Sequence, residues 1–320
     1  MQATSSQALL LPGMGDVRMK TWQAWLLFGL LALTWGSSFI LMKRGLQSFS
    51  YWQIGYLRIA SAWIFTIFIA YRYWRKWRGK NWWALLGVGL FGNGIPYLLF
   101  PLAVNHLDSS LVGVLNSLVP LFTLLIGLLW FGIRVPWLSA LGIGLGFAGA
   151  FWLLAPGLQL QNKSLYYGLF PILATLCYAI SINLINGKLK EERPMAITLY
   201  SLSTVGPVCL FLLFQTDFTS VMQEDSRAWL NAFYVILLGV MGSSLAILIF
   251  NYLIKGTSPL FAASVTYAIP IVALLWGLFD GEPVGMHHLG GMLAILTGVY
   301  LVNRKGKTRL PLRLRGKRAN

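Results

Sequence analysis

Ten long runs of apolar residues, separated by short polar connections, occupy most of this 320-residue sequence. A helix needs roughly 20 mainly apolar residues to cross a bilayer, with about 17 as the lower limit. All the runs reach that limit except the last, which is marginal in length. The sequence therefore predicts an all-α integral membrane protein with transmembrane helices over 22–42, 52–74, 82–104, 109–130, 137–154, 166–184, 195–214, 229–254, 260–278 and 287–302.

The composition excludes a soluble domain. Hydrophobic residues make up 57% of the chain, charged residues only 11%, and the mean hydropathy is +0.67. A soluble domain carries about 25% charged residues. The net charge of +16 and the mixed basic and aromatic stretch at 72–80 could suggest nucleic-acid binding. That stretch lies between two apolar runs, where interfacial aromatics and Lys/Arg are expected, so no nucleic-acid partner is predicted.

The distribution of Lys and Arg predicts the orientation of the chain. Cytoplasmic loops of membrane proteins carry an excess of these residues. With the N-terminus inside, 20 cations lie on the cytoplasmic side and four on the other. Both termini are therefore predicted to be cytoplasmic, in a multi-pass protein of the inner membrane. The basic tail at 303–320 should be attracted to the anionic inner leaflet of the lipid bilayer.

The two halves of the sequence resemble each other. A shift of 150 residues aligns Gly89 with Gly239 and Pro120 with Pro270. Each half has five predicted helices, and an odd number forces the second half into the membrane upside down. Inverted repeats are typical of secondary transporters, whose substrate site lies near the midplane between the repeats. The predicted organisation is an N-terminal segment (1–21), a first repeat (22–154), an outer linker (155–165), a second repeat (166–302) and the tail.

Short motifs in this order resemble the EamA branch of the drug/metabolite transporter superfamily. They are Leu33-Thr-Trp-Gly-Ser-Ser-Phe39 in the first helix, Tyr56-Leu-Arg58 in the second, and the closing Gly281-Glu-Pro-Val-Gly285 with Gly298-Val-Tyr-Leu301. The resemblance covers about residues 22–303 and implies ten helices, two repeats and a central cavity lined by helices 1, 3, 4, 6, 8 and 9. One departure is Arg134, which stands near a glycine where many relatives carry an acidic residue.

Polar and aromatic side chains within the predicted helices are the candidates for substrate binding. Polar groups in hydrocarbon need partners, so they should face the interior of the bundle, where they either line a cavity or form helix–helix hydrogen bonds. The candidate binding residues are Trp35, Ser38, Asn93, Tyr97, Asn116, Tyr178, Ser181, Ser243, Thr266 and Tyr267. The candidate hinges are Gly92, Pro96, Pro120, Gly242 and Pro270.

Charged residues inside the predicted helices are scarce. Arg58 is the one ionised side chain well within a span; a structural role is favoured for it over contact with substrate, and Glu282 is also assigned a structural role. None of the nine acids lies deep in a span, which favours a facilitator or exchanger unless coupling uses a less visible group. No metal site and no cofactor are predicted, since His287 and His288 are adjacent and face different sides of a helix.

These features together predict a secondary transporter that moves small organic metabolites, such as amino acids or similar amphipathic solutes, by alternating access. Export is the expected direction. A membrane-embedded enzyme and a channel are the alternatives; the enzyme would need an acid, base or metal within the bilayer. Small residues at spacing four in 142–150 and 290–298 allow close helix packing, either within a monomer or across a homodimer.

Overall fold

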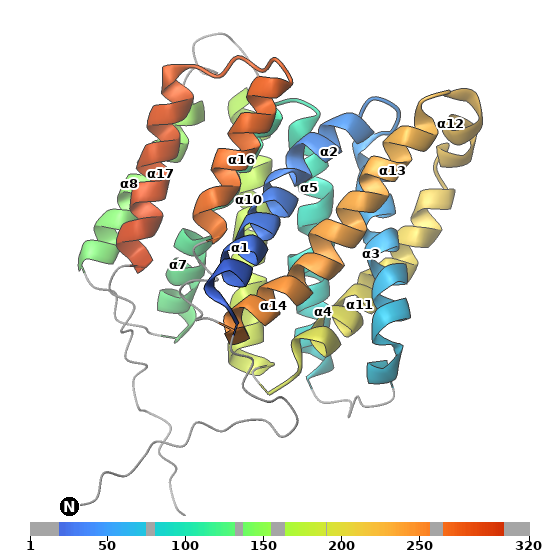
Figure 1. Cartoon of the computed structure of the whole chain (residues 1–320), viewed down its shortest axis with the longest axis horizontal. Coiled ribbons are helices and arrows are strands. Elements are labelled where there is room, and N and C mark those ends of the chain that lie inside the picture. Colours follow the sequence, from blue (N-terminus) through green and yellow to red (C-terminus); the bar gives the residue numbers. More distant parts are fainter. Residues whose placement is uncertain are drawn as a thin grey trace, which may run out of the picture.

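The computed structural model describes residues 19–74, 81–131, 137–154, 164–189, 191–256 and 265–303 (Figure 1). All regular secondary structure within these ranges is helical, which confirms the predicted all-α class. The basic tail from residue 304 onward, most of the outer linker and Arg134 lie outside the described residues.

The first half of the chain forms helices that match the first five predicted spans. In chain order these elements are α1 (Thr21–Gly36), α2 (Ser38–Gly45), α3 (Tyr51–Trp74), α4 (Trp82–Val88), η1 (Gly89–Gly94), α5 (Ile95–Val104), α6 (Ser109–Leu115), η2 (Asn116–Leu118), α7 (Val119–Phe131) and α8 (Trp137–Leu154). The first span is therefore not one uninterrupted helix, because a turn at Ser37 separates α1 from α2.

The second half forms helices that match the last five predicted spans, and a short helix, α12, lies between the seventh and the eighth. Its elements are α10 (Ser164–Lys188), α11 (Pro194–Phe214), α12 (Phe218–Glu224), α13 (Ala228–Gly239), η3 (Val240–Leu245), α14 (Ala246–Gly256), α16 (Val265–Phe279) and α17 (Met286–Asn303). Among the described residues, eight spans are long and apolar enough to cross a membrane. The ninth and tenth predicted spans correspond to the shorter apolar helices α16 and α17.

Two of the spans contain a π-helical segment at matching positions. These segments are η1 in the third span and η3 in the eighth, which correspond under a shift of 151 residues. η1 contains three glycines and η3 contains Gly242, and glycine weakens a helix; Pro96 follows η1 without an N–H to donate to the preceding turn. The predicted hinges Gly92 and Gly242 lie inside these two segments.

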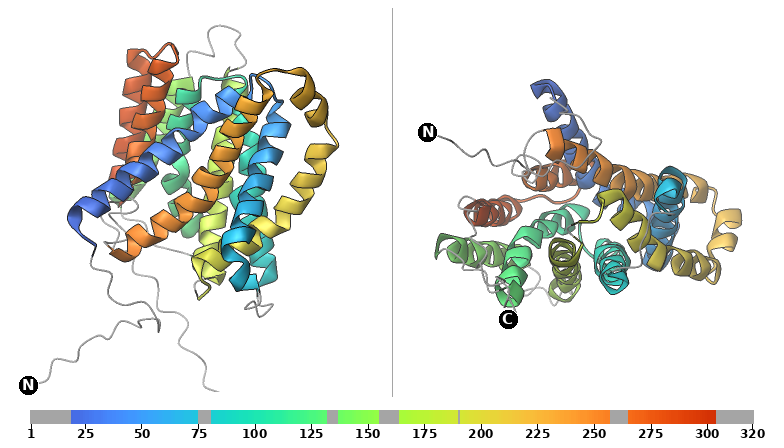
Figure 2. Two further views of the ribbon diagram at one scale, coloured as in Figure 1. Left: turned by 45° about the vertical axis from the view of Figure 1, so that its right-hand side comes forward. Right: turned by 90° about the horizontal axis from the view of Figure 1, so that it is seen from below.

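Helix contacts between the two halves also occur in matched sets. The fifth and tenth spans pack on each other (α8 and α17), as do the second and seventh (α3 and α11). The third span contacts the sixth (α5 and α10), and the first contacts the eighth (α2 and α13). If the first and second halves are exchanged, the contact between the fifth and tenth spans and the contact between the second and seventh spans are each unchanged. The contact between the third and sixth spans becomes the contact between the eighth and first spans. Figure 2 shows the resulting bundle from the side and from below.

The contact between α8 and α17 depends on glycine. A Cβ placed on Gly142 would lie 2.6 Å from the carbonyl oxygen of Gly298, and a Cβ on Gly298 would lie 2.5 Å from that of Gly142. Gly149 makes an equally close approach to Gly291. The small residues at spacing four are therefore used to pack these two helices within one chain.

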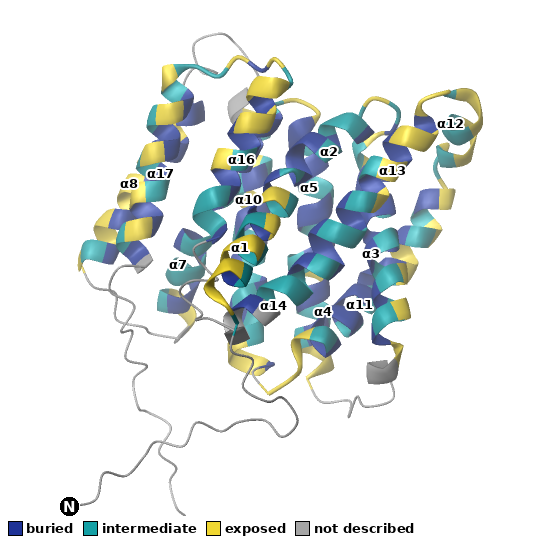
Figure 3. Ribbon diagram, in the orientation of Figure 1, coloured by how far each residue is buried: buried dark blue, intermediate teal, exposed yellow. Residues whose placement is uncertain are grey.

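The outer surface of the bundle is apolar. Phe68, Trp137, Trp229 and Phe279 are each more than 70% exposed, and exposed residues line the outward faces of the helices (Figure 3). Soluble proteins rarely expose a continuous apolar surface of this extent to water. Lipid is the solvent that covers it.

We predict that Gly142→Leu destabilises the fold, because the new side chain has to displace the backbone of α17. Overpacking of this kind costs about 1–3 kcal/mol. The matched control is Gly144→Leu on the same helix, since no atom lies within 4 Å of a Cβ at that position. Thermal unfolding of both variants in detergent tests the prediction, and equal melting temperatures for the two would contradict it.

Candidate functional site

The polar side chains of the bundle form two groups. One is a network of charges at the end that is uppermost in Figure 1, which we call the upper end. The other lies among the helices and contains Arg58, Tyr97 and the residues around the π-helical segments.

Arg58 is buried within α3, with only 5% of its surface exposed. Its guanidinium carbon lies 3.7 Å from the centroid of the Tyr97 ring, in a cation–π contact. One terminal nitrogen, Nη1, lies 3.9 Å from the sulfur of Met42. In the part of the chain that the structure describes, Nε is buried and has no hydrogen-bond partner.

Aromatic side chains surround this arginine. Tyr97 belongs to a buried cluster against which Tyr56 and Tyr178 pack. Tyr178, on α10, also stacks on Phe100 with ring centroids 5.8 Å apart. The structure therefore brings the predicted binding residues Tyr97 and Tyr178 together beside Arg58, with contributions from both halves of the chain.

The two π-helical segments bind the opposite half of the molecule in a matched way. The Asn93 amide, in η1, donates to the Ser201 hydroxyl of α11 at 3.3 Å. The Ser244 hydroxyl, in η3, donates to the Ala62 carbonyl of α3 at 3.0 Å and lies 2.5 Å from the Thr66 hydroxyl. Each irregular segment is thus attached to the neighbouring long helix through a polar side chain.

Further hydrogen bonds among the helices join the first span to η3. The Trp35 indole N–H donates to the carbonyl oxygen of Gly242 at 3.1 Å. Ser38, one turn further along, is buried, and its hydroxyl donates to the Thr34 carbonyl at 3.1 Å. Ser243, next to Gly242, is fully enclosed and its hydroxyl has no hydrogen-bond partner among the described residues.

The remaining predicted binding residues differ from one another in burial and in their contacts. Ser181 is buried against Gly92, where an added Cβ would lie 2.6 Å from the serine hydroxyl. Asn116 and Thr266 are half-buried on the fourth and ninth spans. The Tyr267 hydroxyl donates to the Val299 carbonyl of α17 at 3.2 Å, which is the helix–helix hydrogen bond that the sequence left open as the alternative.

The predicted hinge prolines occupy different positions in their helices. Pro96 stands in the first turn of α5, where a missing N–H is tolerated. Pro270 lies inside α16 and is buried, whereas Pro120 is half-buried near the start of α7. The central arrangement is therefore irregular mainly at η1, η2 and η3.

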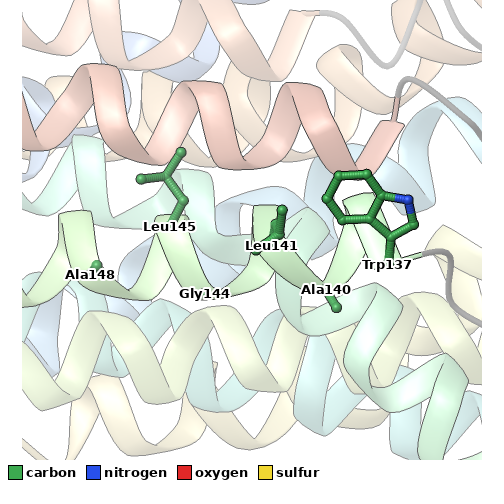
Figure 4. Close-up of a pocket in the computed structure, with 6 residues that line it drawn as sticks. All are labelled: Trp137, Ala140, Leu141, Gly144, Leu145 and Ala148. Atoms are coloured by element: carbon green, nitrogen blue, oxygen red, sulfur yellow. The ribbon is translucent and has the colours of Figure 1, made fainter.

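A groove on the surface of the bundle lies away from these residues. Six residues of α8 line it: Trp137, Ala140, Leu141, Gly144, Leu145 and Ala148 (Figure 4). None of them belongs to the predicted site. The lining is almost entirely apolar and is on the outward face of α8, so this groove matches the acyl chains of lipid.

The upper end contains a charged network that the sequence analysis did not anticipate. The Lys43 ammonium lies 2.5 Å from Asp280 and 2.7 Å from Glu282, and Arg44 also pairs with Asp280. Glu282 further accepts hydrogen bonds from the Ser109 N–H at 3.0 Å, the Ser109 hydroxyl at 2.7 Å and the Ser110 N–H at 3.0 Å. This supports the structural role expected for Glu282.

A second set of hydrogen bonds extends this network across the upper end. Ser48 bonds Asp225 and accepts from the Asn231 amide at 2.7 Å. Gln53, at the start of α3, donates to Asp217 at 2.7 Å. The connections after the first, third, seventh and ninth spans are thus joined by side chains. The sequence does contain a signal for this network, because two adjacent cations and two acids lie at the ends of predicted spans on the same side of the membrane.

The pKa of Glu282 is controlled by opposing effects. Burial raises the pKa of this carboxyl, but hydrogen bonds from Lys43, Ser110 and Ser109 outweigh it and lower the pKa from 4.5 to about 2. Asp108, nearby, has a raised pKa because of burial and the charge of Glu282, with Lys43 acting in the opposite direction.

We predict that Glu282→Gln removes stability only while the carboxyl would be ionised. A pKa held at about 2 in the fold against 4.5 when unfolded corresponds to about 3 kcal/mol. This stability is present above pH 4.5 and is lost as the pH falls towards 2. The difference in unfolding free energy between wild type and variant should therefore disappear over this window. Asp108, whose pKa is raised in the fold, contributes to the pH dependence of stability with the opposite sign, and it is present in both proteins.

The matched control is Glu224→Gln on α12, an exposed position. It should leave the unfolding free energy unchanged at every pH. Denaturant titrations in detergent at several pH values from 7 down to about 2 measure both variants. A pH-independent cost of Glu282→Gln would contradict the assignment of the charged network as the source of stability.

The known proteins that this chain resembles are transporters. The model of the EamA-like transporter family matches residues 23–155 and again 165–304. An uncharacterized transporter of Archaeoglobus fulgidus is 24% identical over 88% of this chain and 99% of its own length. A probable amino-acid metabolite efflux pump of Escherichia coli is 24% identical over 85% of this chain and 92% of its own length.

Two further similarities concern the location and the fold. The inner membrane transporter YedA of Escherichia coli is 25% identical over 85% of this chain and 88% of its own length. A protein crystal structure superposes with a TM-score of 0.56 at 15% identity, covering 88% of this chain and 96% of that one, which shows a shared fold. With its apolar spans and a family match over both halves, the chain belongs to the EamA-like transporter family and is a multi-pass protein of the inner membrane.

Proposed function

We propose that this protein exports small organic metabolites, amino acids or similar amphipathic solutes, by alternating access at a central site between its two halves. The observation that carries the proposal is the matched pair η1 and η3, which interrupt the third and eighth spans beside the buried polar residues. Secondary transporters build their substrate sites near the midplane from such discontinuous helices. The similarity to a probable amino-acid metabolite efflux pump supports the solute class and the direction.

We further propose that the chain consists of ten membrane-spanning helices in two inverted repeats of five, with both termini in the cytoplasm. The family model matches each half separately, and the contacts between halves come in matched sets. The excess of Lys and Arg that the sequence places on one side of the predicted spans supports the orientation. The upper end then faces the outside of the cell.

In this orientation the charged network is the outer closure of the transport path. Lys43 and Arg44 lie on α2, whereas their partners Asp280 and Glu282 lie between α16 and α17, and Ser109 begins α6. Opening the central site to the outside requires these elements to separate. The ion pairs are therefore broken once in each transport cycle.

Transport without a coupling ion is the mode that the charge distribution favours. Within the described residues, all eight Asp and Glu side chains lie in connections, at helix ends or on the short helix α12. Proton- and sodium-coupled carriers usually place an Asp, Glu or His within the membrane for the ion. We therefore propose a facilitator or exchanger.

We predict saturable counterflow of amino acids in proteoliposomes loaded with a mixed amino-acid pool and read by mass spectrometry. Exchange should proceed without an imposed proton or sodium gradient. Asn93→Leu and Asn116→Leu should reduce it about two- to tenfold, because an apolar side chain replaces an amide and a neutral hydrogen bond is worth about 0.5–1.5 kcal/mol. Gly144→Leu, on the lipid-facing groove, is the control and should exchange normally. Absence of exchange by folded wild type would reject the proposed function.

We also predict that weakening the charged network exposes the interior to the outside. The reporter is Val112→Cys on α6, a fully buried position, in a chain whose Cys177 and Cys209 are replaced by Ala. Adding Lys43→Gln and Arg44→Gln should raise its rate of labelling by a membrane-impermeant maleimide several-fold. Lys188→Gln, an exposed cation outside the network, is the control. Unchanged labelling in a folded protein would show that this network is not the outer closure.

A further inference from the structure

The guanidinium of Arg58 is a buried positive charge that no acidic side chain of the described structure neutralises. Within the described residues, the guanidinium contacts the thioether of Met42 and the face of the Tyr97 ring. The acids that lie in the described ranges occur in connections, at helix ends or on α12. A charge inside a bilayer is costly and is retained where function requires it.

The hydrogen-bonding capacity of Arg58 is also largely unused. A guanidinium has five N–H donors in a planar fork. Thioether sulfur is a weak acceptor, and Nε, buried in the same place, has no acceptor within the described residues. A fork of this shape matches a carboxylate, which accepts two parallel charge-assisted hydrogen bonds.

Lys43 and Arg44 show how cations are neutralised elsewhere in this protein. Lys43 is paired with two carboxylates, and Arg44 is paired with one. Arg58 is more deeply buried than either, yet it has no such partner in the described chain. A purely structural interpretation therefore leaves its charge and its donors without an explanation.

The position of Arg58 places it between the two halves. Its ring partner Tyr97 packs with Val205 and Cys209 of α11 and is contacted by Tyr178 of α10. The site proposed above lies at this boundary. Aromatic rings next to a cation provide an apolar wall and a charged end in one place.

We infer that Arg58 binds the carboxylate of the transported solute, so that the substrates are carboxylates and the aromatic residues around Tyr97 hold their apolar part. This inference rests on the proposed function and narrows its solute class. It also replaces the structural role that the sequence favoured for Arg58. Solutes in which the acid is an amide should not be accepted, because a neutral amide leaves the buried charge unpaired.

Counterflow in proteoliposomes with matched solutes tests this inference on the intact wild-type protein. The pairs are L-leucine with L-leucinamide and L-phenylalanine with L-phenylalaninamide, which differ in the carboxylate. At least one acid of these pairs should exchange, at least about tenfold faster than its amide, since the amide cannot accept the charge-assisted hydrogen bonds of the guanidinium. Equal exchange of acid and amide would overturn the inference and leave the proposed transporter intact. No exchange of either pair or of the mixed amino-acid pool would reject both.

Variants of Arg58 provide the second measurement. Arg58→Lys keeps the charge without the fork and should raise KM for the acids about tenfold with a smaller effect on kcat; Arg58→Gln should abolish their saturable exchange. Ser61→Ala, one turn along α3, is the control and should exchange as wild type does. An unchanged KM in folded Arg58→Gln would overturn the inference. If that variant does not fold, the comparison of acid and amide in wild type decides.

Discussion

The bilayer offers no hydrogen bonds, and this constraint explains where the polar residues of the protein lie. A backbone or side-chain group inside hydrocarbon has to find its partner within the protein. The irregular segments η1 and η3 are the places where this requirement is most severe, because their backbone departs from the regular helical pattern. Polar contacts gather there accordingly: Asn93 bonds Ser201, Ser244 bonds α3, and the Trp35 indole reaches the carbonyl of Gly242.

The charged residues obey the same constraint in two different ways. At the upper end, Lys43 and Glu282 are paired and hydrogen-bonded, and the network lowers the pKa of Glu282 even though burial acts in the opposite direction. Among the helices, Arg58 is held by a ring and a sulfur atom. The first arrangement is complete within the described chain. The Arg58 guanidinium has no anionic partner in the described chain. For this reason we assign the paired network at the upper end to closure of the transport path and Arg58 to recognition of the substrate.

The sequence predicted the all-α class, eight of the membrane spans and the family because these depend on local composition and on motifs that are contiguous in the chain. It did not predict the turn at Ser37. It also did not predict the partners of Lys43, because those ion pairs join residues more than 200 positions apart in the chain. Tyr267 shows a further limit. Its polarity suggested a binding residue, but which neighbour a hydroxyl reaches depends on the rotation of α16 against α17, which a single sequence does not specify.

The packing of the helices indicates where a change of access has to take place. α8 and α17 touch backbone to backbone through Gly142 and Gly298, which leaves no space for one helix to slide past the other. α3 and α11 are similarly joined, with Trp63 lying over Gly206 and bonding Ser203. In the proposed transport cycle we expect each of these pairs to move as a unit. The segments η1 and η3 lie beside the α3–α11 pair and carry polar contacts of the centre, so we expect the motion to be concentrated where the helices are already interrupted.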